Sequence, residues 1–126
     1  MSVRYLTAAE IYTINEEIVG HRPLVRDRHL LVSAVNRPQT RAFGQEAYPT
    51  LIDKAAALLH SLAAHHLFQD GNKRTAQRAT EFFLSENALE PTWSADEAYQ
   101  YILEIAMSRH DVEDVAVWLQ THTREA

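Results

Sequence analysis

The sequence has no cysteine and only three glycines among its 126 residues. Without cysteine, the chain can form neither a disulfide framework nor a thiolate metal site. The three glycines, Gly20, Gly44 and Gly71, cannot form a G-x-G-x-x-G loop, which excludes the phosphate-binding loops of ordinary kinases and Rossmann folds. A P-loop is excluded as well, because the segment that begins at Gly71 lacks the first glycine and an upstream strand.

Long apolar runs and an excess of positive charge are also missing. No apolar run approaches the length that spans a membrane, and the N-terminus lacks a signal-peptide pattern, so we expect a cytoplasmic protein without membrane contact. The net charge of −5 argues against direct nucleic-acid binding. With 46% hydrophobic and 23% charged residues, the 126-residue chain is predicted to form one globular domain, 1–126.

Apolar residues recur with a period close to 3.6 throughout, which predicts an all-α domain of about six helices. Capping boxes at Thr7 and Ser94 are expected to begin two of them, and Asp27, Thr50 and Asp111 to cap three more. The predicted helices cover approximately residues 8–19, 28–35, 51–65, 72–85, 95–107 and 112–121. No strand of usual length is predicted.

The chain is organised around the segment His66–Thr75, HLFQDGNKRT, where the third predicted helix ends and the fourth begins. The first turn of a helix has unpaired N–H groups and a partial positive charge, so it is a natural site for an anion such as phosphate. Here Asn72 would add a neutral donor, Lys73 a compact charge and Arg74 a planar fork for two oxygens. The segment therefore predicts a phosphate site.

Two more side chains of this segment add chemistry. Asp70 offers the hard oxygen ligand that Mg²⁺ prefers when phosphates and water complete its shell. His66 carries an imidazole, a group that can take a proton from an attacking hydroxyl. Together they favour transfer of a phosphorus group from a nucleotide. The competing interpretation is a solvated turn, which explains poorly why two cations stand where the helix dipole disfavours them.

The segment matches the signature H-x-F-x-[D/E]-G-N-[G/K]-R at His66, Phe68, Asp70, Gly71, Asn72, Lys73 and Arg74. The sequence therefore resembles the Fic/Doc superfamily. Lys73 stands where typical Fic adenylyltransferases have glycine. The residue three positions after Arg74 is Gln77, where those enzymes have a second arginine. Both departures resemble the Doc (death-on-curing) branch, the toxins of toxin–antitoxin pairs. The founding Doc has alanine in place of Gly71, although many Doc-like sequences carry glycine.

The resemblance implies a role for each residue of the motif. His66 would be the general base, Phe68 would pack into the core and fix the loop, and Asp70 would hold Mg²⁺. The nucleotide phosphates would be bound by Gly71, Asn72, Lys73 and Arg74. In the Doc branch the lysine fills the space that glycine leaves open, and the nucleotide binds reversed, with its γ-phosphate toward the target hydroxyl. Arg78 could reach a phosphate or simply face solvent.

The resemblance also implies the reaction and the partners. We expect a kinase-type toxin that uses ATP and Mg²⁺ to phosphorylate a Ser or Thr hydroxyl of a protein, with elongation factor Tu as the expected target. A Phd-like antitoxin would insert a helix or disordered tail into a groove near the site. The segments that begin at Thr13 and Thr121 lack the last residue of the [S/T]-x-x-x-E-[G/N] self-inhibitory motif, which favours a separate antitoxin. The alternatives are adenylyl transfer on the same fold and a non-catalytic binding module.

Residues 36–49 contain two prolines and a glycine and show no apolar period, which predicts a loop or a small hairpin before the central helix. Long loops in compact domains are often functional. In Fic folds the loop at this place is a flap that clamps the target. The candidates for target or nucleotide contact are Arg37, Arg41, Phe43 and Tyr48. A solvated basic loop is an equal alternative for any one of them.

Overall fold

The computed structural model describes residues 2–126, which form six α-helices. Their bounds are α1 Ala8–Val19, α2 Arg28–Asn36, α3 Leu51–Ala64, α4 Asn72–Glu86, α5 Ala95–Ala106 and α6 Val112–Thr121. Five of the six begin at a side chain that accepts a hydrogen bond from the first turn, and these are the five predicted caps, Thr7, Asp27, Thr50, Ser94 and Asp111. The predicted all-α class is therefore confirmed.

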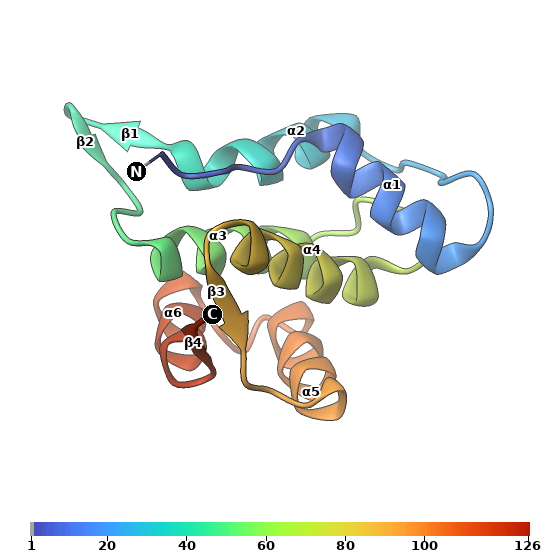
Figure 1. The fold of residues 1–126 in the computed structure, drawn as a ribbon. Coiled ribbons are helices and arrows are strands. Elements are labelled where there is room, and N and C mark those ends of the chain that lie inside the picture. Colours follow the sequence, from blue (N-terminus) through green and yellow to red (C-terminus); the bar gives the residue numbers. More distant parts are fainter. Residues whose placement is uncertain (1) are drawn as a thin grey trace.

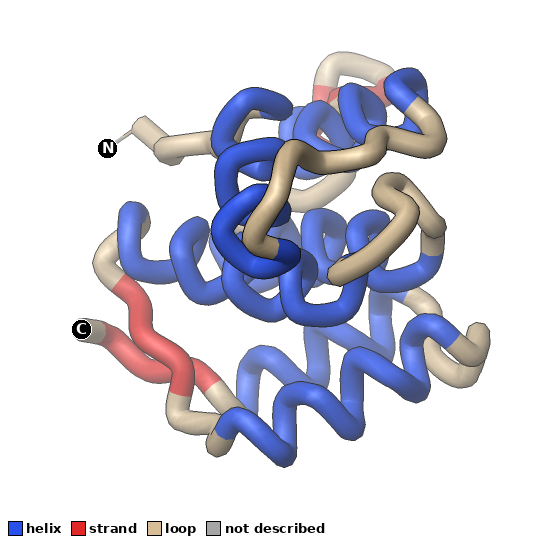
Figure 2. The backbone as a smooth tube through the Cα atoms, turned by 90° about the vertical axis from the view of Figure 1, so that its right-hand side faces the viewer, coloured by secondary structure: helices blue, strands red, loops and turns tan. Residues whose placement is uncertain are grey.

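The helices lie in three tiers (Figures 1 and 2), with α1 and α2 above, α3 and α4 in the middle, and α5 and α6 below. The central helix is α3, which contacts α2, α4, α5 and α6. Its alanines and leucines, such as Ala56 and Leu59, are buried on nearly all sides. Alanine lets the backbones of neighbouring helices approach closely, so α3 packs against them in the core, and the motif segment follows its C-terminal end.

A small hairpin lies between α2 and α3, as the turn residues suggested. The 3₁₀-helix η1 (Arg37–Gln39) leads into β1 (Arg41–Ala42), which pairs antiparallel with β2 (Gln45–Glu46). Phe43 and Gly44 form its two-residue turn with φ values of 53° and 76°, the left-handed pair that matches the twist of the strands. The hairpin extends away from the helical tiers at one end of the molecule (Figure 1).

A second pair of strands was not predicted. β3 (Leu89–Pro91) follows α4 and pairs antiparallel with β4 (Thr123–Glu125) at the C-terminus. Segments of three residues are too short to show an alternating pattern, and their pairing joins distant parts of the chain. This ribbon ties the end of α4 to the end of α6.

Trp93, in the loop between β3 and α5, packs against Trp118 of α6 in the lower tier. Trp118 stacks on Tyr101 at 4.3 Å between ring centroids, on His122 at 4.1 Å and on Trp93 at 5.3 Å. Burial, helped by nearby carboxylates, raises the pKa of Tyr101 to about 12. These rings therefore stabilise the lower tier as a fixed support for α4. Within residues 2–126, no helix is long and apolar enough to cross a membrane.

Candidate functional site

The motif segment turns sharply at Gly71, which precedes the first residue of α4 and has a φ of +77°. A Cβ at this position would lie 3.0 Å from Val19 Cγ1, 3.2 Å from Asn15 Nδ2 and 3.2 Å from Ile18 Cγ2. Glycine is thus required twice, once for the left-handed backbone and once for the close approach of α1. The turn was predictable, but the crowding by α1 was not.

Asn15, on α1, holds the turn from above. Its side-chain N–H groups donate to the carbonyl oxygen of Asp70 at 2.9 Å and to Thr75 Oγ1 at 3.1 Å. Asn15 is 1% exposed, so these hydrogen bonds are shielded from water and stabilise the turn more than exposed ones would. Sequence reasoning missed this residue, and the available signal was an amide among the isoleucines of the apolar face of α1.

Asn72 holds the same turn from within. The backbone N–H of Phe68 donates to Asn72 Oδ1 at 2.9 Å, and Asn72 Nδ2 donates back to the Phe68 carbonyl oxygen at 2.8 Å. The phenyl ring of Phe68 is buried in the core. We expected the Asn72 side chain to bind phosphate, but the structure uses its amide to close the loop. The second hydrogen of Asn72 Nδ2 and the backbone N–H of Asn72, in the first turn of α4, can still donate to an anion.

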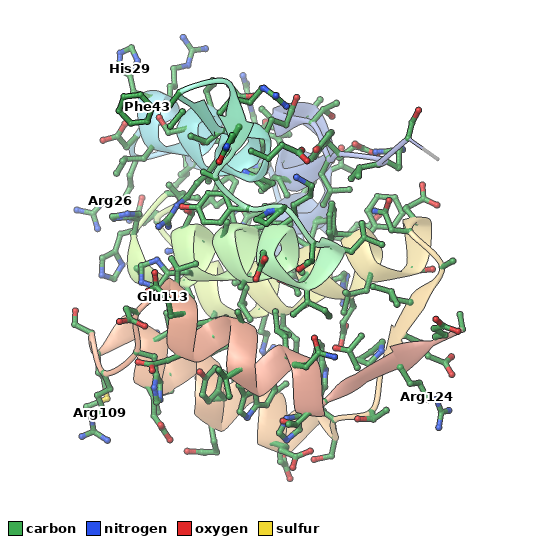
Figure 3. All side chains as sticks on the ribbon, turned by 90° about the vertical axis from the view of Figure 1, so that its left-hand side faces the viewer. Arg26, His29, Phe43, Arg109, Glu113 and Arg124 are labelled. Carbon is green, nitrogen blue, oxygen red and sulfur yellow. The ribbon has the colours of Figure 1, made fainter. Side chains whose placement is uncertain are left out.

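The loop before α2 holds the motif segment from the other side. Val25 and Phe68 form an isolated antiparallel bridge. The N–H of Arg26 donates to the Leu67 carbonyl oxygen at 2.8 Å, and the N–H of Gln69 donates to the Leu24 carbonyl oxygen at 2.9 Å. This pairing brings Arg26, a cation that the sequence did not single out, next to the segment; Figure 3 shows its side chain projecting outward.

The N-terminus of α4 differs from those of the other five α-helices of residues 2–126, because no side chain caps it. A hollow of about 320 Å³ opens there, lined by Ile18, Val19, Gly71, Asn72, Lys73, Arg74 and Tyr99. Within residues 2–126, neither Lys73 nor Arg74 forms an ion pair. Free backbone donors and two unpaired cations around one hollow suit a phosphate group.

Asp70 and His66 are both exposed. No group of three or more His, Asp or Glu side chains that could hold a metal occurs in residues 2–126. A single carboxylate beside a phosphate site fits Mg²⁺, which takes most of its ligands from phosphates and water. His66 follows the end of α3 and does not line the hollow at α4. A bound nucleotide would therefore have to extend beyond the hollow to meet this imidazole.

The base of the hairpin is anchored to α3 by Lys54, which is 2% exposed. Its ammonium donates to the Tyr48 carbonyl oxygen at 2.6 Å, to Glu46 Oε1 at 2.8 Å and to the Pro38 carbonyl oxygen at 3.4 Å. Burial opposes the charge, but the interactions with Glu46 and Tyr5 outweigh it and raise the pKa of Lys54. Lys54 reads as a surface residue in the sequence, and only the return of the hairpin over α3 buries it.

Two of the four predicted flap contacts, Arg37 and Tyr48, interact with the protein itself. Arg37 Nε donates to the Tyr48 hydroxyl at 3.0 Å, and Arg37 Nη1 donates to Ser61 Oγ at 2.9 Å and to His60 Nδ1 at 3.0 Å. Burial and the nearby Arg37 charge lower the pKa of His60. Arg37 and Tyr48 therefore hold the hairpin to α3, and their contact with a target stays a prediction.

The other two predicted flap contacts, Arg41 and Phe43, are exposed. Arg41 Nη2 donates to the Gly44 carbonyl oxygen at 2.8 Å across the turn. Phe43 is fully exposed, and Figure 3 shows its ring at the edge of the molecule. The tip thus presents an aromatic ring to solvent. Arg78, which could have reached a phosphate or faced solvent, is exposed, and its Nη1 lies 3.5 Å from Glu17 Oε2.

Comparisons with known proteins cover most of the chain. A family model described as the Fic/DOC family matches residues 5–84, which include α1 to α3, the hairpin, the motif segment and most of α4. Toxin Doc of Mycolicibacterium smegmatis is 41% identical over 117 residues, which cover 91% of this chain and 90% of that protein.

Proposed function

This chain belongs to the Fic/Doc family, and we propose that it is a Doc-like toxin of a toxin–antitoxin system. In this proposal it transfers the γ-phosphate of ATP to a Ser or Thr hydroxyl of a cytoplasmic protein and thereby blocks translation. Elongation factor Tu is the expected target. The similarity to Toxin Doc and the motif residues His66 to Arg74 support this proposal.

The observation that carries the proposal is the uncapped N-terminus of α4. In the other five α-helices of residues 2–126, a side chain accepts a hydrogen bond from the first turn. In α4, the first N–H groups instead face the hollow that Lys73 and Arg74 line. A helix end without a protein cap needs another hydrogen-bond partner. A phosphate supplies acceptor oxygens and a negative charge that suits the helix dipole.

The residues then take the following roles. The first amides of α4, with Lys73 and Arg74, hold the phosphates in place, and positioning supplies much of the rate in such reactions. His66 accepts the proton of the target hydroxyl as its oxygen forms a bond to the γ-phosphorus. The bond from this phosphorus to the β–γ bridging oxygen breaks, and ADP leaves. Mg²⁺, held by Asp70, would neutralise phosphate charge when bound.

Adenylyl transfer on the same site is the second candidate, and Lys73 argues against it. A lysine side chain at this position takes space and adds charge where glycine would leave room for an α-phosphate. The test uses ATP labelled at the γ-phosphate and ATP labelled at the α-phosphate, each incubated with the protein and elongation factor Tu. Label on the target from the γ position alone is the expected result. Label from the α position would overturn the kinase assignment.

An antitoxin is the partner that the proposal requires. Beside α4, an apolar hollow of about 460 Å³ lies against α1, lined by Ala9, Glu10, Thr13, Ile14, Glu17, Arg78 and Phe82. A hollow of this kind suits the apolar face of a Phd-like helix or tail. Expression of the chain in bacteria with and without its neighbouring open reading frame tests this point. We expect growth arrest only without the neighbour, and arrest in both cases would contradict the antitoxin proposal.

A further inference from the structure

A hollow of about 640 Å³ is formed by residues of α2, η1 and the C-terminal part of α3, and it shares no residue with the hollow at the start of α4. We call it the α2–α3 hollow. Its lining includes Thr40, which leads into β1, and His65, which directly precedes the proposed base His66. The hollow therefore lies between the hairpin, which is proposed to meet the target, and the residue proposed to act on the target hydroxyl.

Arg37 lines the α2–α3 hollow and carries a charge that no carboxylate balances. Its guanidinium is half-buried, and it donates to Tyr48, His60 and Ser61 through Nε and Nη1. His60 accepts through Nδ1, and burial, together with the Arg37 charge, lowers its pKa, so all three partners are neutral. Among residues 2–126, Arg37 forms no ion pair and its Nη2 donates no hydrogen bond. Charges that are withdrawn from water are ordinarily paired, so the free Nη2 indicates an anionic ligand.

The rest of the lining also favours an anion. Ser33, Asn36 and Thr40 are exposed and offer hydroxyl and amide donors. No Asp or Glu of residues 2–126 lines this hollow. A carboxylate accepts hydrogen bonds through two oxygens, and such bonds are stronger when the donor is a guanidinium. The α2–α3 hollow thus combines one free charged donor with several neutral ones.

The chain around the hollow carries charge of the same sign. Residues 18–45 contain five arginines and one acidic residue, Asp27, whereas the whole chain has a net charge of −5. The Asp27 carboxylate caps α2, where it accepts from the N–H of Leu30. Figure 3 shows Arg26 and His29 on the same side of the view as Phe43, at the tip of the hairpin. A positive surface attracts an acidic partner and disfavours a basic one.

We propose that the α2–α3 hollow binds the side-chain carboxylate of an acidic residue of the target protein, close in sequence to the Ser or Thr that receives the phosphate. This rests on the proposed function, because it assumes that the target hydroxyl meets His66. His60, in the lining, precedes His66 by six residues, which is on the order of 10 Å along α3 and its end. An extended chain covers this distance in about three residues, so we expect the acidic residue roughly three positions from the acceptor.

The first test changes the charge of the hollow and measures the transfer of labelled γ-phosphate to elongation factor Tu over a range of target concentrations. Asn36→Asp adds a negative charge to the lining with little change in shape, and Asn36→Ser leaves the lining neutral. Gln39→Glu is the matched control, because Gln39 is exposed on η1 and does not line the hollow.

We expect Asn36→Asp to raise the KM for the target roughly tenfold, because the added charge repels the carboxylate in the ground state and the transition state alike. The kcat, the KM for ATP and the melting temperature should not change. Asn36→Ser and Gln39→Glu should stay within about twofold of the parent, since an exposed charge outside the hollow is screened by salt.

The second test requires no catalysis. Two-dimensional ¹H–¹⁵N NMR spectra are recorded while a capped triglutamate peptide, or a capped triglutamine peptide, is added to the parent protein and to Asn36→Asp. Mg²⁺-ATP is present throughout to occupy the proposed phosphate site. We expect triglutamate, and not triglutamine, to shift the side-chain signals of Arg37 and Asn36 in the parent. The shift of the Arg37 signal should be lost in Asn36→Asp.

The outcomes separate this inference from the proposed function. An unchanged KM for the target in Asn36→Asp would overturn the carboxylate site. An equal rise in Gln39→Glu would also overturn it, because diffuse surface charge would then explain the effect. If the parent transfers no phosphate to elongation factor Tu, the proposed function loses its target, and the peptide spectra alone decide the inference. Triglutamate that shifts no signal of the hollow would overturn it in either case.

Discussion

The motif segment before α4 and the hairpin after η1 are both polar loops, yet the protein holds them in opposite ways. The motif segment is fastened along its length by Asn15 from α1, by Asn72 from α4 and by the backbone of the loop before α2. Lys54 and Arg37 fasten the hairpin at its base and at Glu46 of β2, whereas Phe43 at its tip is fully exposed.

This difference fits two tasks. Phosphoryl transfer needs reacting groups held within a fraction of an ångström, which requires a loop whose shape is determined from several sides. Contact with a protein target benefits from an exposed element that can adapt its tip to a partner. We therefore interpret the motif segment as the chemical part of the site and the hairpin tip as the part that meets the target.

The largest effect should come from His66→Ala, which would remove the proposed proton acceptor. We expect phosphate transfer to fall by roughly 10²–10⁴, the range for a general base, and growth inhibition to disappear. Because His66 is exposed and forms no hydrogen bond within residues 2–126, the melting temperature should not change. His65→Ala, at the exposed neighbouring position, is the control. A His66→Ala protein that remains as toxic as the parent would favour a non-catalytic binding module.

Gly71→Ala should give the next largest effect and tests how tightly the motif segment is held. The alanine would combine a left-handed φ with contacts of 3.0–3.2 Å to α1, so we expect a loss of about 3 kcal/mol in the free energy of unfolding. Gly20 has the same φ of +77° with no atom within 4 Å of a Cβ. Gly20→Ala should therefore lose only about 1 kcal/mol in urea denaturation. Equal losses in both variants would show that α1 does not constrain the turn.

Lys54→Met tests the base of the hairpin. Methionine keeps much of the apolar stem but leaves the carbonyl oxygens of Pro38 and Tyr48 without their donor. We expect a loss of about 2 kcal/mol in the free energy of unfolding, together with faster amide exchange in β1 and β2. The amides of the motif segment should keep their protection. Faster exchange there would mean that the two loops are coupled, contrary to the comparison above.

Glu10→Gln tests α1, the helix that carries Asn15. The hydrogen bond from Arg4, with the backbone of Thr7, outweighs partial burial and lowers the pKa of Glu10 from 4.5 to about 2. A carboxyl with a lowered pKa stabilises the folded state above its unfolded pKa and loses this contribution as the pH falls from about 4.5 to about 2. Glutamine can keep the capping box but loses the ion pair.

At pH 7 the Glu10→Gln protein should therefore be less stable than the parent by up to about 1 kcal/mol. The difference should shrink steadily below pH 4.5, where the carboxyl of the unfolded parent takes up a proton while that of the folded parent stays ionised until about pH 2. Urea denaturation at several pH values measures it. A difference that stays constant down to pH 2.5 would show that the ion pair with Arg4 is not its source.

Phe43→Gly should give the smallest effect on stability. It removes a fully exposed ring from a residue with a φ of 53°, so the free energy of unfolding should change by less than about 0.5 kcal/mol. We expect a higher KM for the protein target and unchanged binding of ATP, measured by labelled phosphate transfer over a range of target concentrations. An unchanged KM would remove the tip from the target interface.

Most helices were predictable because their signals are local. A cap such as Thr50 with Asp53, or the 3.6-residue period of α5, lies within one or two turns of chain and needs no knowledge of what packs against it. The strands β3 and β4 were not predictable from local signals, because segments of three residues show no period. Their hydrogen bonds come from pairing with each other.

The motif was recognisable for the same reason, since its residues lie within ten positions of the chain, from His66 to Thr75. The support of the motif was not recognisable. Asn15 and Tyr99 reach the site from α1 and α5, and no local pattern tells which side chain of a helix will meet a distant loop. The Asn72 amide, for which phosphate binding stays a prediction, also pairs with the backbone of Phe68, a contact that the sequence did not indicate.

The order of residues along the chain was enough to identify the six helices, the turn at Gly71 and the group of cations that follows it. The packing of the three tiers decided the rest: that α1 leaves no room for a Cβ at Gly71, that Lys54 becomes buried under the hairpin, and that Tyr99 borders the phosphate hollow. Helix formation depends on neighbours in the chain, whereas burial and clefts arise only when distant elements come together.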